Sequence, residues 1–146
     1  MEFDSDYEIY FLTKSFYEIS LQILADVPKL ILLTHNLLEK EDSELCRYFD
    51  SHNMFSLLYP EFEKWYPTIF SGILKQSSIR IFDRIVGGAN QIVAFVFIVI
   101  CTSCRYLIME QNNAKSIVKI IESSLGLEKS ELIVNKAIAS LDKTQK

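Results

Sequence analysis

Residues 79–104 read IRIFDRIVGGANQIVAFVFIVICTSC, and every residue from Ile92 to Cys101 is apolar. A transmembrane helix needs about 20 predominantly apolar residues. This run is shorter, because Asn90 precedes it and Arg105 follows it after two other polar residues. A short helix that is apolar on all sides is buried inside a protein. We therefore predict that the segment from Ile92 to Met109 is a central core helix and that the chain has no transmembrane span.

The composition is that of a globular helical protein. The chain has 146 residues, of which 49% are hydrophobic and 23% charged, and its 4 Gly and 3 Pro leave few of the tight turns that an all-β fold needs. The net charge of -4 argues against binding to nucleic acid, which requires a basic face. The N-terminal segment MEFDSDYEIY is acidic, unlike a secretory signal peptide. We expect one domain over residues 1–146, a cytoplasmic location and three free thiols.

Apolar spacing and capping residues predict about eight helices. The first covers residues 6–25, with an apolar face formed by Ile9, Leu12, Phe16, Ile19 and Ile23. Pro28 fits the first turn of a second helix over residues 29–40. The remaining helices are expected to begin at or near residues that cap or open helices: Asp42 or Ser43, Pro60, Ser77, Asn90, Asn113 and Ser130. Because no alternating strand pattern persists, the expected fold is a single compact all-α domain around the central apolar helix.

Residue types that carry catalysis or bind metals occur here in patterns that favour structural roles. Cys101 and Cys104 form a C-T-S-C pair inside the apolar helix, where core packing is expected rather than redox chemistry or zinc binding. His35 and His52 stand alone, and we interpret His35 as a surface or hydrogen-bonded residue rather than a metal ligand. No phosphate-binding glycine loop or serine nucleophile motif is present. The sequence therefore predicts no catalytic residue, no metal site and no cofactor.

Two further features lie near the apolar helix. Arg80 and Asp83 are three residues apart and so share a helix face. They form either a surface pair that contributes up to about 1 kcal/mol or a semi-buried structural pair. Their helix should end at Gly87 and Gly88, since glycine tolerates the left-handed conformation. Trp65 is the only tryptophan, and we expect it to anchor the core rather than to bind a ligand.

These residues resemble, in order and spacing, the second half of a TBC domain. The stretches LLEKEDSELCRYFDSHNM, FEKWYPTIFSGIL and SSIRIFDRIVGG carry the resemblance. It covers residues 37–141 best, and Phe82 stands where the family usually has tryptophan. The C-terminal part is also similar to the TBC-domain subunits of tuberin–hamartin (tuberous sclerosis) complexes. The resemblance implies a fold like the C-terminal lobe of a TBC domain, with structural roles for Trp65, Phe70, Arg80, Phe82, Asp83 and Gly87.

The family's catalytic motifs distinguish between possible functions. TBC GTPase-activating proteins use an arginine in I-x-x-D-x-x-R and a glutamine in Y-x-Q, and neither motif is found here. The resemblance therefore implies a non-catalytic adaptor that binds a hamartin-like coiled coil or amphipathic helix. Such an adaptor supports a GTPase-regulating complex that restrains TOR signalling, with recruitment to the lysosomal membrane through that complex. We also expect an exposed apolar face on residues 9–23 and, through it, a homo-oligomer.

Two alternative functions remain open. A fragment of a Rab GTPase-activating protein would share the fold, although it would need the two catalytic motifs. The segment NQIVAFVF, residues 90–97, is weakly similar to Bcl-2-like apoptosis regulators, which bind a BH3 helix in a groove. The Trp-Gly-Arg that belongs to that segment is absent. The helical peptide that binds, from a hamartin coiled coil or from a BH3 protein, discriminates between these functions.

Overall fold

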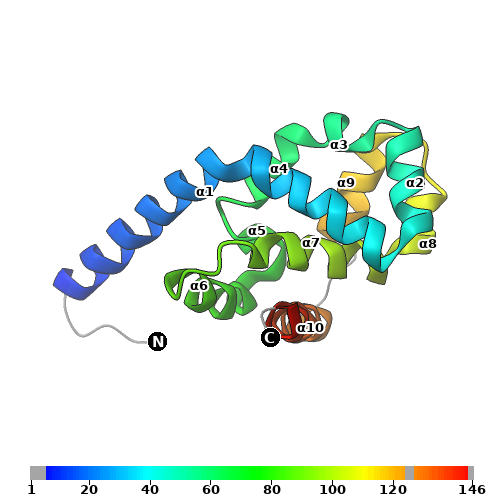
Figure 1. Cartoon of the computed structure of the whole chain (residues 1–146). Helices are drawn as coiled ribbons and strands as arrows, with labels where there is room; N and C mark the ends of the chain where they lie inside the picture. The colour runs from blue at the N-terminus through cyan, green and yellow to red at the C-terminus, as the bar shows by residue number, and fades with distance from the viewer. Residues whose placement is uncertain (1–5, 124–126, 145–146) are drawn as a thin grey trace.

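The computed structural model describes residues 6–123 and 127–144, which contain ten α-helices, one 3₁₀ helix and no strand (Figure 1). The prediction of an all-α fold is confirmed. The helices outnumber the eight expected because short helices form in the expected connections. In chain order they are α1 (Asp6–Glu41), α2 (Ser43–Ser51), α3 (Met54–Leu57), α4 (Tyr59–Trp65), α5 (Ser71–Leu74), η1 (Lys75–Ser77), α6 (Ser78–Val86), α7 (Ile92–Ser103), α8 (Arg105–Met109), α9 (Ala114–Ser123) and α10 (Leu127–Thr144).

α1 is one continuous helix where the sequence predicted two. Pro28 lies inside it, and a proline within a helix removes one backbone hydrogen bond and bends the helix. Figure 1 shows α1 changing direction partway along, with its first turns reaching beyond the rest of the fold. Pro28 is exposed, whereas Ile23, Val27 and Leu30 are buried. The helix therefore continues because its buried face packs on both sides of the proline, while solvent can bond to the freed carbonyl group.

α7 is the core helix that the sequence predicted. Every residue from Ile92 to Cys101 is buried, and α7 packs mainly against α1 and α10. The helix ends at Ser103, and the backbone N–H of the following Cys104 donates to the carbonyl groups of Ile100 and Cys101 at 3.2 Å each. The prediction of one helix as far as Met109 was therefore wrong, since α8 is a separate helix. Within the described ranges, no helix is both long and apolar enough to cross a membrane.

Two of the predicted helix caps are confirmed and two are wrong. The side chains of Asp42 and Asn113 accept backbone N–H groups of α2 and α9 at 3.2 and 2.8 Å. Ser77 precedes α6, but its hydroxyl donates to the Glu131 carboxylate at 2.9 Å, a charged and therefore stronger acceptor. Asn90 does not cap α7, because backbone carbonyl groups of the preceding turn accept the first N–H groups of that helix.

The end of α6 and the start of α10 lie close to the residues at which the sequence predicted them. α6 ends as expected, with Gly88 in the left-handed region at φ 99°. α10 begins at Leu127, slightly earlier than the predicted start near Ser130. Its expected apolar stripe is present, with Val134, Ala137 and Leu141 buried. α10 thus covers α7 on the side away from α1 and α4 (Figure 1).

An aromatic cluster fills the core between α4 and α7. Trp65 is 2% exposed, and its ring centroid lies 6.1 Å from those of Phe62 and Phe97 and 6.2 Å from that of Phe70. This burial agrees with the role of a core anchor. Ile69 and Phe70 adopt φ values of 57° and 56°, which are uncommon for such residues. The unusual turn places both of their side chains in the core.

Candidate functional site

The central helix α7 reaches the surface along one stripe only. Between Ile92 and Cys101, the residues with any exposure are Phe95 at 7%, Ile98 at 5% and Val99 at 8%. Together with the half-buried Thr102, they occupy positions i, i+3, i+4 and i+7, which share one face of a helix. The most apolar element of the chain therefore presents a narrow apolar stripe to the outside.

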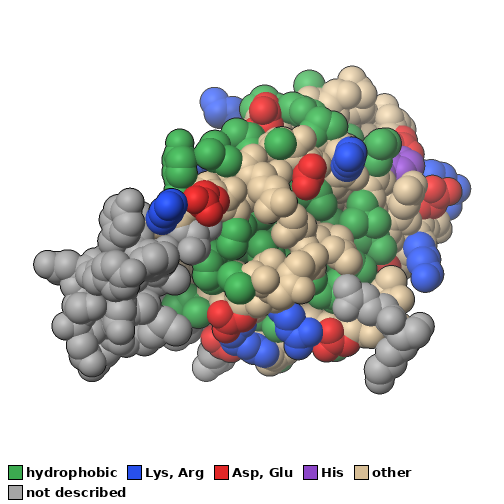
Figure 2. Space-filling model, turned by 60° about the vertical axis from the view of Figure 1, so that its left-hand side comes forward, with side chains coloured by type: hydrophobic (Ala, Val, Ile, Leu, Met, Phe, Trp, Pro, Cys, Tyr) green, Lys and Arg blue, Asp and Glu red, His purple; other side chains and the backbone are tan. Residues whose placement is uncertain are grey.

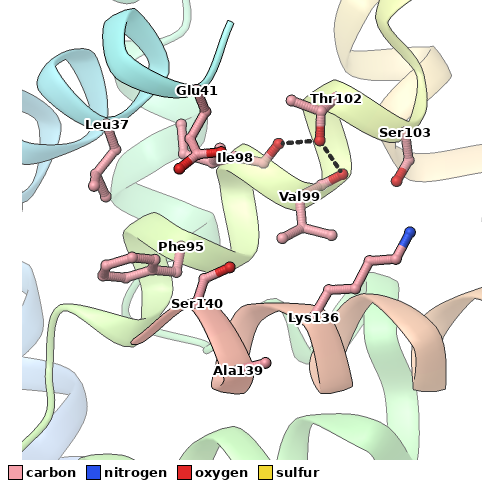
Figure 3. A pocket seen from close by; sticks show the side chains of 10 residues that line it. All are labelled: Leu37, Glu41, Phe95, Ile98, Val99, Thr102, Ser103, Lys136, Ala139 and Ser140. Atoms are coloured by element: carbon pink, nitrogen blue, oxygen red, sulfur yellow. Dashed lines mark hydrogen bonds between the residues drawn. The ribbon is translucent and has the colours of Figure 1, made fainter. Parts of the chain in front are cut away.

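This stripe forms the floor of a groove with a volume of about 430 Å³. α1 supplies Leu37 and Glu41 to one wall, and α10 supplies the opposite wall. Figure 3 shows side chains from the three helices converging on this shared space, which we call the α7 groove. Its full lining is Leu37, Glu41, Phe95, Ile98, Val99, Thr102, Ser103, Lys136, Ala139 and Ser140.

The walls of the α7 groove carry opposite charges. Glu41 and Lys136 are both exposed, and within the described residues neither forms an ion pair. Figure 3 places them on opposite sides of the groove. Thr102 donates its hydroxyl to the carbonyl groups of Ile98 and Val99, at 2.9 and 3.1 Å, so its donor is already used within α7. The α7 groove is therefore an apolar surface flanked by opposite charges.

Arg80 and Asp83 do not pair with each other. Arg80 Nη1 lies 3.3 Å from Glu131 Oε2, and Arg84 Nη1 lies 2.7 Å from Asp142 Oδ1. Asp83 is exposed and takes part in no ion pair within the described residues. Both predicted forms of the Arg80–Asp83 pair were wrong, because carboxylates of α10 reach the arginines of α6. Two ion pairs therefore join α6 to α10.

The remaining motif residues contribute to packing around α6 and α4. Trp65 and Phe70 lie in the aromatic cluster described above. Phe82 is half-buried and stacks on Phe16 of α1, with ring centroids 5.7 Å apart. Gly87 ends α6, and a Cβ atom at this position would lie 3.4 Å from the carbonyl oxygen of Arg84. None of these residues lines the α7 groove, and their common family role stays a prediction.

A polar cluster that the sequence analysis missed joins α8 to the start of α2. Arg105 Nε lies 2.7 Å from Asp42 Oδ2, and its Nη2 lies 3.1 Å from Asp42 Oδ1 and 3.4 Å from Glu44 Oε2. The side chain of Asp42 is 14% exposed and that of Arg105 is 22% exposed. The hydrogen bond from Arg105 is the main cause that lowers the pKa of Asp42, against an opposing effect of burial. No spacing rule connects residues so distant in the sequence.

The cysteines of the C-T-S-C pair lie in the core, in agreement with their predicted packing role. Cys101 and Cys104 are both buried. Burial raises the pKa of the Cys101 thiol well above its ordinary value, so the group stays protonated and unreactive at neutral pH. Neither thiol of the pair is exposed as a redox site requires.

His35 belongs to a second missed cluster, between α1 and α2. Its Nε2 lies 3.0 and 3.1 Å from the two carboxylate oxygens of Asp50 and 3.7 Å from Cys46 Sγ. The expectation of a hydrogen-bonded His35 agrees with these contacts. The sequence contained a further signal, because Glu39 follows His35 by four residues and Asp50 follows Cys46 by four. The interpretation that His35 stands alone, with no carboxylate at ligand spacing, was therefore wrong.

The structure is thus an all-α domain in which α1, α7 and α10 enclose a groove with an apolar floor. No family model matches the chain, and no solved structure matches it. It does match TBC1 domain family member 7 from Bos taurus, with 33% identity over 113 residues, which is 77% of this chain and 38% of that protein. The protein of the same name from Homo sapiens is 27% identical over 133 residues, covering 90% of this chain and 44% of that protein.

A third relative gives the same result. TBC1 domain family member 7 from Xenopus tropicalis is 31% identical over 102 residues, which cover 69% of this chain and 34% of that protein. The chain is thus homologous to part of TBC1 domain family member 7, and this supports the relationship to TBC domains that its motifs indicated. It spans less than half the length of the curated relatives that it matches.

Proposed function

We propose that the chain acts, as one helical domain over residues 1–146, as a non-catalytic adaptor that binds a partner helix in the α7 groove. The observation that carries this proposal is the narrow stripe of Phe95, Ile98 and Val99 at the floor of the groove. An amphipathic helix recognises such a surface with anchors at i, i+3, i+4 and i+7. The homology to TBC1 domain family member 7 favours this function over the Bcl-2-like alternative.

The proposed partner is the C-terminal coiled coil of a hamartin-like protein. This partner comes from the resemblance to the TBC-domain subunits of tuberin–hamartin complexes. The charges of the groove add a requirement, since Glu41 and Lys136 lie on opposite walls. We expect the bound helix to present an apolar stripe with a basic side chain toward Glu41 and an acidic one toward Lys136. In this role the protein acts in the cytoplasm, reaches the lysosomal membrane with its complex and helps to restrain TOR signalling.

The arginines support an adaptor rather than a GTPase-activating protein. All four lie in helices, and Arg80, Arg84 and Arg105 are held by carboxylates outside their own helices. An arginine finger has to reach the nucleotide from a position beside it, and it raises GTP hydrolysis by roughly 10³–10⁵. A side chain already engaged in an ion pair is poorly placed for that task.

One segment of α1 matches the family's arginine motif at every defined position except the arginine itself. Ile23, Asp26 and Lys29 have the spacing of I-x-x-D-x-x-R, with lysine where the motif has arginine. In this structure the segment lies inside α1, with Ile23 fully buried and Lys29 exposed. Lysine lacks the planar, forked set of donors with which arginine contacts phosphate oxygens. This near match therefore gives little support to catalysis.

Calorimetry and a GTP turnover assay together test the proposed function. A hamartin C-terminal coiled-coil peptide should bind the chain, whereas a BH3 peptide should not. Addition of the chain to GTP-loaded Rab or Rheb should leave hydrolysis at its intrinsic rate. Stimulated turnover would overturn the adaptor proposal, and failure of the hamartin peptide to bind would remove the proposed partner.

The predicted apolar face of residues 9–23 is not the exposed one, since Ile23 is fully buried and Ile19 packs against the core, and the side chains of Ile9 and Leu12 lie outside the described residues. A different stripe on the first half of α1 supports the proposal of self-association. Tyr17, Leu21 and Leu24 are 63%, 48% and 42% exposed, and their steps of four and three residues are those of a coiled-coil seam. The exposed Pro28 and Leu32 continue the stripe along α1. Figure 2 shows the face toward the start of α1, where apolar side chains gather between a few charged ones. We propose that α1 of a second copy covers this stripe.

A further inference from the structure

α1 and α2 form a helical hairpin that brings two mixed pairs of side chains together. His35 and Glu39 are four residues apart on α1, and Cys46 and Asp50 are four residues apart on α2. Residues at this spacing project from the same helix face. Only Asp42 separates the two helices in the chain, and they lie side by side (Figure 1). The hairpin thus places nitrogen, sulfur and oxygen donors next to one another.

The donor atoms are already spaced as ligands of one ion. His35 Nε2 lies 3.1 Å from Asp50 Oδ2 and 3.7 Å from Cys46 Sγ, and Cys46 Sγ lies 3.9 Å from the same Asp50 oxygen. Zinc binds nitrogen and oxygen at about 2.0–2.2 Å and sulfur at about 2.3 Å in tetrahedral geometry, so ligand atoms around it lie about 3.3–3.6 Å apart. Each edge of the triangle needs to change by only a few tenths of an ångström.

We propose that His35, Cys46 and Asp50 form a zinc-binding site with a fourth position open to water or to the Glu39 carboxylate. Imidazole, thiolate and carboxylate are the ligands that zinc takes in proteins, and sites with three protein ligands and a water are well established. Binding transfers the thiol proton of Cys46 to solvent. It also shifts the imidazole proton of His35 to Nδ1, because Nε2 becomes the ligand atom.

The surroundings favour a cation at this position. Cys46 is 2% exposed, while the side chains of His35 and Asp50 are 33% and 52% exposed, so an ion can enter from the Asp50 side. The negative charges of Asp50 and Glu39 both act on Cys46, and the same two carboxylates attract a divalent cation. The ring of Phe55 lies 5.3 Å from that of His35 and restricts its orientation.

A bound zinc ion would fix the part of α1 that lines the α7 groove. Leu37 and Glu41 follow His35 by two and six residues on the same helix, and both belong to the groove wall. A metal that joins His35 to α2 would therefore hold this wall in place. The inference stands independently of the identity of the partner that occupies the groove.

Titration of the untagged, reduced and metal-free chain with Zn²⁺ against a fluorescent zinc chelator tests this proposal. We expect one zinc ion per chain, and Co²⁺ should produce a thiolate-to-cobalt charge-transfer band. Cys46→Ser and Asp50→Asn should each weaken binding by roughly tenfold or more. His52→Gln is the matched control, since His52 lies on the same hairpin but outside the cluster, and its affinity should equal that of the wild type.

Two outcomes would overturn the zinc site. One is the absence of stoichiometric binding to the folded wild-type chain. The other is an affinity that Asp50→Asn leaves unchanged. Because Asp50 is half exposed, this variant decides the question even if Cys46→Ser fails to fold. As a second readout, zinc should protect Cys46 from alkylation in the wild type, detected by mass spectrometry of the labelled peptide.

Discussion

The Asp42–Arg105 contact should contribute measurably to stability. Two substitutions of Asp42 separate the effect of this ion pair from the effect of the helix cap. Asp42→Asn keeps a good helix N-cap, because asparagine caps as well as aspartate, but it removes the charge that faces Arg105. Exposed ion pairs contribute about 0.2–1 kcal/mol, and removal of one partner from a buried pair costs about 3–5 kcal/mol. Since both side chains are mostly but not fully buried, we expect a loss of about 1–2 kcal/mol.

Asp42→Ala removes the N-cap of α2 as well as the charge. Loss of a cap typically costs about 1 kcal/mol, so the alanine variant should lose about 2–3 kcal/mol in total. For a chain of this length, that loss corresponds to a fall in melting temperature of about 5–10 °C. Urea unfolding followed by far-UV circular dichroism and by the fluorescence of Trp65, with EDTA present, provides the measurement. Asp83→Ala is the matched control and should change the free energy of unfolding by less than about 0.5 kcal/mol.

The pH dependence of the stability difference between the wild type and Asp42→Asn identifies the charge of Asp42 as the source of that difference. Arg105 lowers the pKa of Asp42 in the folded state below its ordinary value of 3.8. The stabilisation is therefore fully present above that ordinary pKa and is lost as the pH falls through the lower, folded-state pKa. The difference between the wild type and Asp42→Asn should be constant at neutral pH and shrink below about pH 4. Equal stabilities at pH 7, or a difference that persists in acid, would refute the reasoning.

Three further predictions concern other contacts. Tyr66→Phe should cost about 1 kcal/mol in urea unfolding, because the buried Tyr66 hydroxyl bonds to the Thr34 hydroxyl at 2.6 Å; no loss would contradict this contact. Arg84→Ala should lose less than about 1 kcal/mol, and the loss should vanish in high salt, since its pair with α10 is exposed; a larger, salt-independent loss would disprove this. Sedimentation should show oligomers of the wild type at micromolar concentration and monomers of Leu21→Glu/Leu24→Glu; monomers in both would rule out the proposed seam.

Local signals in the sequence were sufficient to predict the fold class and the core. The apolar run of α7 has no polar face, so burial was the only stable outcome in water. Asp42 and Asn113 cap helices because their side chains bond to the backbone only a few residues away. Gly88 ends α6 for an equally local reason. For the caps and the helix end, the deciding interactions lie within one or two turns of the chain.

Tertiary contacts decided the features that the sequence could not reveal. Pro28 would end an isolated helix, but burial on both sides of it keeps α1 continuous. Arg80 could have paired with Asp83 on its own helix, yet a carboxylate of α10 lies within its reach. The α7 groove depends on where α1 and α10 leave α7 uncovered, and the residue pattern of α7 contains no trace of that arrangement. The sequence indicated the cluster around His35 only weakly, through the two mixed pairs His35/Glu39 and Cys46/Asp50 at four-residue spacing.

Binding of the hamartin coiled-coil peptide to two α10 variants tests the adaptor account most directly. Ala139 is exposed and lines the α7 groove, whereas Asn135, one turn earlier, is exposed and lies outside it. Arginine is a good helix former at both positions, so neither Ala139→Arg nor Asn135→Arg should disturb the fold. Calorimetry should show that Ala139→Arg weakens peptide binding by at least about tenfold, equivalent to about 1.4 kcal/mol, while Asn135→Arg binds like the wild type. Equal affinities for the wild type and Ala139→Arg would contradict the claim that the partner helix lies in the α7 groove.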